Sequence, residues 1–255
     1  MKVLVIGDVI GKPGRVALSH LLPQLRERHA IDIVVANGEN TAGGLGVTVK
    51  TLTELQAAGV DVVTSGNHIW HHKEIIPHLE DDRPLIRPLN YPPAAPGKGT
   101  HLIGSLLVVN LIGRTFIAPF DCPFRAMDAL LADLPSEVKA VLVDFHAEAT
   151  SEKVALGRYL DGRVAAVLGT HTHVGTIDSR ILPNGTAYVT DIGMMGPIDS
   201  IIGDDPEMVL SRFLTMIPGR LSVGKGPVEF NGMLVTIDEE TGLATDLVRL
   251  QETVR

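Results

Sequence analysis

The chain has 255 residues, of which 45% are hydrophobic and 20% are charged. With 22 Lys and Arg against 30 Asp and Glu, its formal net charge is −8. This composition excludes a disordered chain, and it disfavours a general nucleic-acid or membrane-surface binder, whose charge is basic. The one cysteine, Cys122, cannot form an internal disulfide or a zinc or iron–sulfur site that needs several cysteines.

Three short apolar runs in the first 80 residues are typical of buried parallel strands, which are apolar on both faces: residues 3–6, 31–36 and 60–64. Apolar periodicity predicts helices after these runs, over residues 16–29, 47–58 and 69–79. The alternation of strand and helix indicates an α/β sheet.

The pattern changes beyond residue 80. Five prolines and two glycines indicate a connecting loop over residues 83–99. Further strands are predicted over residues 102–120, 140–145, 164–169, 186–190, 228–237 and 245–250, with a hairpin turn at residues 238–242. Helices are predicted over residues 126–134 and 152–160. No repeat or domain boundary is evident, so we expect one domain of mixed sheets over residues 1–255.

No stretch reaches the roughly 18–20 apolar residues of a membrane span. The apolar run near the N-terminus is too short for a signal peptide and leads at once to Asp8. These features predict a soluble cytoplasmic protein.

Five predicted strands lead to side chains that can bind metal ions. In chain order these are Asp8, Glu39 with Asn40, Asn67 with His68, His146, and His171 with His173. Because the carboxyl ends of parallel strands meet at one edge of a sheet, we expect these eight side chains to lie together. Each residue alone could be a turn or core residue. Two carboxylates, two carboxamides and four imidazoles in one place, with no nearby Lys or Arg, indicate a metal centre.

The types of side chain restrict the metal. No thiolate is present, and imidazole with carboxylate suits Mn, Fe, Zn or Co. Seven ligands are too many for one four-coordinate ion but suit two ions that share a carboxylate. Two metals about 3.5–4 Å apart form the clamp used in phosphate-ester hydrolysis. His171 and His173 are two residues apart, so in an extended chain both imidazoles would reach the same site.

Two neighbouring motifs are interpreted differently. His71 and His72 could form another ligand face with His68, but we favour a place at the rim beside Trp70. The glycine-rich segment at residues 43–46 lacks the Lys-Ser/Thr of a P-loop, and we expect it to approach the site with its backbone.

These motifs resemble those of the calcineurin-like metallophosphoesterases, which carry Gly-Asp-x-His, Gly-Asp-x-x-Asp, Gly-Asn-His, a lone His and Gly-His-x-His, each after a strand. The corresponding segments here are Gly7-Asp8-Val9-Ile10, Asn37-Gly38-Glu39-Asn40, Gly66-Asn67-His68, His146 and Thr170-His171-Thr172-His173. Ile10 replaces a ligand histidine and Glu39 replaces the bridging aspartate, while Asn40 could supply the missing ligand. This combination is similar to the YmdB-like branch of bacterial phosphodiesterases over almost the whole chain.

The resemblance implies an α/β/β/α sandwich of two mixed sheets flanked by helices. It implies two metal ions at the strand ends, Fe or Mn in preference to Zn, Co or Mg. Asp8, Asn40 and His173 would bind one ion. Asn67, His146 and His171 would bind the other, Glu39 would bridge them, and His68 would be the general acid.

The implied reaction is hydrolysis of 2′,3′-cyclic nucleotides, with 3′,5′-cyclic nucleotides as a further class, by water that the two metals activate. The alternatives are a phosphomonoesterase, a nuclease acting on short RNA, or a nucleotide-responsive regulatory protein that keeps its metals for binding. His68 argues against pure binding, which needs no leaving-group acid. We expect a small phosphodiester as partner, and neither a stable nucleic-acid complex nor a membrane. A homo-oligomer remains open, and residues 194–202 fit a lid, a subunit contact or core.

Overall fold

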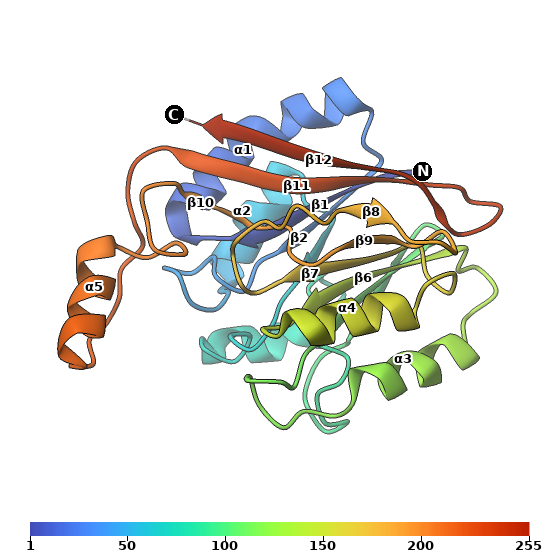
Figure 1. Ribbon diagram of the computed structural model, residues 1–255, viewed down its shortest axis with the longest axis horizontal. Helices are drawn as coiled ribbons and strands as arrows, with labels where there is room; N and C mark the ends of the chain where they lie inside the picture. The colour runs from blue at the N-terminus through green and yellow to red at the C-terminus, as the bar shows by residue number, and fades with distance from the viewer. Residues whose placement is uncertain (255) are drawn as a thin grey trace.

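Apolar side chains on both faces of two β-sheets build the core of the protein. The computed structural model describes residues 1–254, in which two six-stranded sheets pack face to face and helices cover their outer faces (Figure 1). This is the predicted α/β/β/α arrangement. No helix in this part of the chain is long and apolar enough to cross a bilayer.

The first sheet has the strand order β12-β11-β10-β1-β2-β3. Its strands are β1 (Lys2–Val9), β2 (Ile33–Asn37), β3 (Val62–Thr64), β10 (Met194–Pro197), β11 (Val228–Ile237) and β12 (Ala244–Val254). Strands β10, β1, β2 and β3 run parallel, whereas β11 is antiparallel to its neighbours. Helices α1 (Gly11–His29) and α2 (Val49–Ala58) connect β1 to β2 and β2 to β3, and pack on the outer face.

The second sheet has the order β4-β5-β6-β7-β9-β8. Its strands are β4 (Thr100–Ile103), β5 (Leu106–Ile112), β6 (Ala140–His146), β7 (Ala166–Thr170), β8 (Arg180–Ile181) and β9 (Ala187–Val189). The four central strands are parallel, and β4 and β8 form antiparallel edges. Helices α3 (Pro123–Ala132) and α4 (Thr150–Tyr159) cover its outer face.

The space between the sheets is filled by small aliphatic side chains. Val3 and Val35 of the first sheet belong to the same buried cluster as Val108 and Leu142 of the second. Because every second residue of a strand points to the same face, the other set, such as Leu4 and Val34, packs against α1 and α2. Continuous apolar strands are therefore required, since both faces are buried.

Three regions differ from the sequence prediction. The helix expected over residues 69–79 is a 3₁₀ helix, η1 (Lys73–Leu79), which contains Pro77 and therefore lacks one backbone donor. The strands expected over residues 102–120 end at Ile112. Residues 194–202 are divided: β10 is an interior strand, whereas Ile198 and Ile202 beyond it are exposed.

Helix α5 (Pro206–Thr215) was not predicted. The Asp205 carboxylate accepts the backbone N–H groups of Glu207 and Met208 at 3.0 and 3.2 Å and so caps the first turn. The helix projects from the body (Figure 1), and Val209 is its one buried side chain, while Phe213 and Leu214 are 74% and 83% exposed. The sequence does carry signals for this helix, namely Asp205 and Pro206 at its start and apolar residues at helical spacing after them, but they were not used.

Candidate metal centre

All eight predicted residues lie at the C-terminal ends of five strands. Strands β1, β2 and β3 supply Asp8, Glu39, Asn40, Asn67 and His68, and β6 and β7 of the other sheet supply His146, His171 and His173. The side chains therefore meet across the two sheets and not along one sheet edge. Asp8, Glu39 and His146 are fully buried, so the carboxylates have lost almost all contact with solvent.

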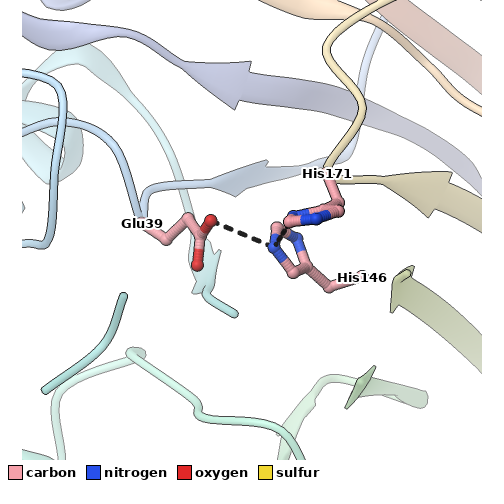
Figure 2. A group of neighbouring side chains, drawn as sticks. All are labelled: Glu39, His146 and His171. Atoms are coloured by element: carbon pink, nitrogen blue, oxygen red, sulfur yellow. Dashed lines mark hydrogen bonds and ion pairs between the residues drawn. The ribbon is translucent and has the colours of Figure 1, made fainter. Parts of the chain in front are cut away.

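One group of side chains surrounds His146. Figure 2 shows the His146 ring between Glu39 and His171. Its Nε2 atom lies 3.0 Å from both Glu39 Oε1 and His171 Nδ1, and 3.2 Å from Asn67 Oδ1. Potential ligand atoms of Glu39, His146 and His171 all lie within 4.8 Å of one another. These four side chains thus present their donor atoms to the same point.

A second group surrounds Asp8. Its Oδ1 atom lies 3.6 Å from His173 Nε2 and 3.5 Å from Asn40 Nδ2. The other oxygen, Oδ2, accepts the backbone N–H of His171 at 3.1 Å and so ties the two groups together. Asn40 faces this group with its amide nitrogen, 3.1 Å from His173 Nε2. Coordination through its oxygen would require the amide to turn over.

The tautomer of His146 follows from its hydrogen bonds. The Thr170 hydroxyl donates to Asp144 Oδ1 at 2.7 Å, so it must accept from the His146 Nδ1 atom, 3.0 Å away. Nδ1 therefore carries a proton, and Nε2 is the ring nitrogen that faces Glu39 and His171.

The protonated ring nitrogens of His171 and His173 can also be assigned from their hydrogen-bond partners. His171 Nε2 lies 3.1 Å from Glu148 Oε2, and His173 Nδ1 lies 2.7 Å from the Ile202 carbonyl oxygen. Both partners are acceptors, so each of these nitrogens carries the proton. The other ring nitrogens, His171 Nδ1 and His173 Nε2, point into the site.

These residues fit a metal centre. His146 Nε2 and His171 Nδ1 lie 3.0 Å apart beside the buried Glu39 carboxylate, an arrangement that favours a positive species, a proton or a metal ion, among these atoms. Two buried carboxylates add further negative charge. Imidazole nitrogens whose second nitrogen donates to a fixed acceptor, together with carboxylates, are the usual ligands of divalent first-row metals.

Acid–base properties agree with this donor set. Burial alone would raise the pKa of Glu39, but His146 and His68 outweigh it and hold the pKa well below its ordinary value. Burial opposes ionisation of Asp8 as well, yet His173 and His146 lower its pKa. Burial and the neighbouring His146 lower the pKa of His171 to about 3. These two carboxylates and this imidazole are thus in the forms that bind cations. Burial opposes protonation of the other two imidazoles, but Asp8 raises the pKa of His173 to about 9, and Glu39 and Asp8 raise the pKa of His146. A bound cation would displace these two protons.

A family model for the YmdB-like proteins matches residues 4–250. The chain belongs to the YmdB-like family. It is 46% identical to a 2′,3′-cyclic-nucleotide 2′-phosphodiesterase of Bacillus subtilis, over 98% of this chain and 96% of the relative. A crystal structure of a hypothetical protein from Thermus thermophilus has 46% identity and a TM-score of 0.93, with 100% of both chains covered. The structure of a phosphatase from Mycoplasma pneumoniae has 34% identity and a TM-score of 0.93, over 100% of this chain and 94% of that one.

In this YmdB-like chain, His68 differs from the other imidazoles of the site. Its Nδ1 atom lies 3.0 Å from Asn40 Oδ1 and 3.3 Å from Glu39 Oε1, so Nδ1 carries a proton. The backbone N–H of His68 donates to Glu39 Oε2 at 3.0 Å. The side chain remains about one-third exposed and lines the cavity above the site. His68 is thus anchored to the centre while part of its ring stays accessible to a substrate.

His71 and His72 lie outside the ligand group, as predicted. His72 Nε2 lies 3.1 Å from the Leu45 carbonyl oxygen, and the two rings contact each other with centroids 4.9 Å apart. The Cβ atom of His71 and the ring of His72 pack against Gly46 of the glycine-rich loop. They support this loop.

Ile10 fills the position where the wider superfamily has a ligand. It is buried, and Cβ atoms added at Gly196 or Gly203 would come within 2.9 Å of its side chain. These two glycines leave room for the branched side chain. The position therefore belongs to the core in this chain.

The prediction that His171 and His173 reach the site from an extended segment was wrong. Neither residue is extended: their φ angles are +97° and +65°, in the left-handed region that non-glycine residues rarely adopt. The tight turn sends His171 towards His146 and His173 towards Asp8. Such backbone strain persists only where surrounding contacts hold it.

Those contacts come from a buried ion pair that the sequence analysis did not identify. Asp191 Oδ2 accepts both the backbone N–H and the hydroxyl of Thr172, at 3.2 and 2.7 Å. Lys153 Nζ lies 2.7 Å from the same carboxylate oxygen and donates to the Thr170 carbonyl oxygen at 2.7 Å. The hydrogen bonds of Lys153 and Asp191 therefore hold the turn between the two histidines in place.

Asp144 and Glu148 also went unassigned, although both stand beside His146 in the sequence. Asp144 lies under the site, where it accepts hydrogen bonds from Thr64, Thr170 and Asn37. Burial raises its pKa to about 6. Glu148 orients His171. Both carboxylates are visible in the sequence within two residues of His146. Only the fold shows that Asp144 acts on His146 through Thr170 and that Glu148 contacts His171.

Proposed function

We propose that this protein is a metal-dependent phosphodiesterase that opens 2′,3′-cyclic nucleotides, and that 3′,5′-cyclic nucleotides are a further substrate class. The observation that carries the proposal is the convergence of His146 Nε2 and His171 Nδ1 on buried Glu39. The 46% identity to the B. subtilis phosphodiesterase over nearly the whole length of both chains supports the substrate class.

In this proposal the centre holds two metal ions, with Fe or Mn preferred over Zn, Co or Mg. Asp8, Asn40 and His173 bind one ion, and Asn67, His146 and His171 bind the other. Glu39 lies between the two groups and bridges them. When bound, the ions would supply an acidified water as nucleophile and positive charge next to the phosphate.

The residues of the chain perform the remaining steps. Thr170, Glu148 and the Ile202 carbonyl each accept a hydrogen bond from one of the three proposed ligand imidazoles and so orient the rings. Lys153 and Asp191 keep the histidine turn in place. Preorganised ligands need no rearrangement as charge develops on the phosphate.

His68 is proposed to protonate the leaving oxygen. Its Nδ1–H is held by Asn40 and Glu39, which leaves Nε2 for the substrate. A ribose alkoxide is a poor leaving group, so an acid at this position contributes typically about 10²–10⁴-fold to the rate. A regulatory protein that only binds nucleotide would not need it.

The cavity over the centre also bears on substrate size. It has a volume of about 280 Å³ and is lined by residues of both sheets and by the loops at 44–45 and 202–204. With the net charge of −8, a small phosphodiester fits this site better than a long polyanion. A cytoplasmic location, a single domain and no stable nucleic-acid complex stay predictions of the sequence, and a homo-oligomer stays open.

A product assay tests the proposal. The full-length protein, loaded with Mn or Fe, is incubated with 2′,3′- and 3′,5′-cyclic nucleotides, nucleoside monophosphates and short RNA. We expect the 2′,3′-cyclic substrates to give nucleoside monophosphate without loss of the phosphate. Release of inorganic phosphate from monophosphates alone would establish the phosphomonoesterase alternative, and cleavage of internal RNA bonds alone would establish the nuclease.

A further inference from the structure

Two loops form the wall of the cavity opposite the metal-binding side chains. The first is the glycine-rich segment at residues 43–46, and the second is the segment at residues 201–204 that leads into α5. They contribute Leu45, 43% exposed, and Ile202, 53% exposed. Large aliphatic side chains left open at the mouth of a polar site need an apolar partner to cover them.

Both loops are held in defined conformations. Gly44 and Gly46 have φ angles of +97° and +77°, which glycine adopts without strain, and His72 Nε2 lies 3.1 Å from the Leu45 carbonyl oxygen. Ile202 has a φ angle of +49°, which is rare for a β-branched residue. Its carbonyl oxygen accepts from His173 Nδ1 at 2.7 Å. The position of Ile202 is therefore coupled to a metal-binding histidine.

Asp204 adds a polar group to this wall. A Cβ atom added at Gly44 would lie 3.8 Å from Asp204 Oδ1, so the carboxylate faces the glycine-rich loop. Within residues 1–254 this carboxylate accepts no side-chain or backbone hydrogen bond, whereas the cavity's other carboxylates, Glu39 and Glu148, pair with histidines. Burial raises the pKa of Asp204. The carboxylate is therefore free to accept hydrogen bonds from a ligand in the cavity.

We propose that Leu45, Ile202 and Asp204 form a nucleobase subsite that favours guanine. This proposal rests on the proposed cyclic-nucleotide phosphodiesterase activity. The phosphate cannot bind here, because a carboxylate repels it. Enzymes that bind single bases cover the faces of the ring with apolar side chains and read its Watson–Crick edge with hydrogen bonds.

The carboxylate selects among the bases by the donors they present. Guanine offers a ring N–H and an amino group side by side on one edge, which two carboxylate oxygens can accept together. Inosine is guanosine without that amino group. Adenine and cytosine offer only an amino group, and uracil presents its one ring N–H between two carbonyl oxygens that a carboxylate repels. A buried acceptor discriminates strongly against a ligand that lacks its donor.

The test is steady-state kinetics of the metal-loaded full-length protein. The substrates are guanosine, inosine and uridine 2′,3′-cyclic phosphates and bis(p-nitrophenyl) phosphate, which has no base. For the wild type we expect kcat/KM at least about tenfold higher with guanosine than with inosine. Asp204→Asn should remove this preference, while the exposed Asp82→Asn serves as the matched control and should keep it.

The aliphatic residues are tested in the same way. Leu45→Ser should raise KM for all three nucleotides but not for bis(p-nitrophenyl) phosphate. Leu45→Met, which keeps an apolar side chain, should have the KM values of the wild type. Equal kcat/KM for guanosine and inosine in the wild type would overturn the subsite alone. The subsite would also be overturned if Asp204→Asn lowered kcat/KM for bis(p-nitrophenyl) phosphate as much as for the guanosine substrate. Failure to cleave any cyclic nucleotide would overturn the proposed activity, and the subsite with it.

Discussion

Lys153 Nζ lies 2.7 Å from Asp191 Oδ2, and the two side chains are 1% and 0% exposed. Asp191 in turn binds Thr172, the residue between His171 and His173. This buried ion pair thus holds the backbone of the turn between His171 and His173 in place.

Lys153→Met should destabilise the protein, because it leaves the Asp191 charge buried without its partner. We expect the free energy of unfolding in urea to fall by about 3–5 kcal/mol. The control is Arg163→Met, which removes an ion pair of the same length, 2.7 Å, to Asp128, with side chains 37% and 43% exposed. That variant should lose at most about 1 kcal/mol. Equal losses in both variants would show that the buried pair has no special role.

Gly66→Ala should prevent assembly of the metal site. A Cβ atom at this position would overlap the His146 ring and the Glu39 carboxylate, which cannot both move away and still face each other. The purified variant should contain less than about half of the wild-type metal by elemental analysis. Gly219→Ala, where nothing lies within 4 Å, is the control. Normal metal content in Gly66→Ala would contradict the packing described for the centre.

Glu148→Ala should weaken metal binding through His171. Without the acceptor at Nε2, the imidazole is free to rotate and to move its proton to Nδ1. The expected loss is about 10–100-fold in metal affinity, measured by competition with a chelating dye. The exposed Glu137→Ala should leave this affinity unchanged. An unchanged affinity in Glu148→Ala would remove the positioning role.

His68→Ala should lower the turnover of a cyclic nucleotide by about 10²–10⁴-fold and leave both metals in place. An activated aryl ester has a good leaving group and should lose much less. The half-buried His78, which lies outside the site and pairs with Asp81 at 2.9 Å, provides the control His78→Ala. Equal losses on the alkyl and aryl esters would argue against a general acid.

The sequence was sufficient to predict that these eight side chains lie together, because each comes at or just after the end of an apolar strand, as Asp8 ends residues 3–8 and His146 ends β6. Their roles as ligands and general acid stay predictions. Parallel strands bring the ends together within each sheet, but the rule did not show that two sheets share the site. The α/β/β/α arrangement was implied by the resemblance to the metallophosphoesterases and not by this rule.

What the sequence could not show depends on residues far apart in the chain. Lys153 and Asp191 are separated by 38 positions and sit in different elements, so no pattern pairs them. The tight turn at His171 is set by that pairing, and the extended geometry assumed for it was wrong. Helix α5, in contrast, was missed although its sequence carries local signals: Asp205 and Pro206 mark its start, and Val209 and Phe213 lie four residues apart.

The central claim is that a two-metal centre on Glu39 hydrolyses the phosphodiester. Its most direct test is to strip the full-length protein with a chelator and titrate Mn or Fe back while following hydrolysis of a 2′,3′-cyclic nucleotide. We predict that turnover is lost on stripping and saturates at about two ions per chain, and that Glu39→Ala neither retains the ions nor recovers turnover. Full turnover in the stripped protein, or full metal occupancy in Glu39→Ala, would contradict the account.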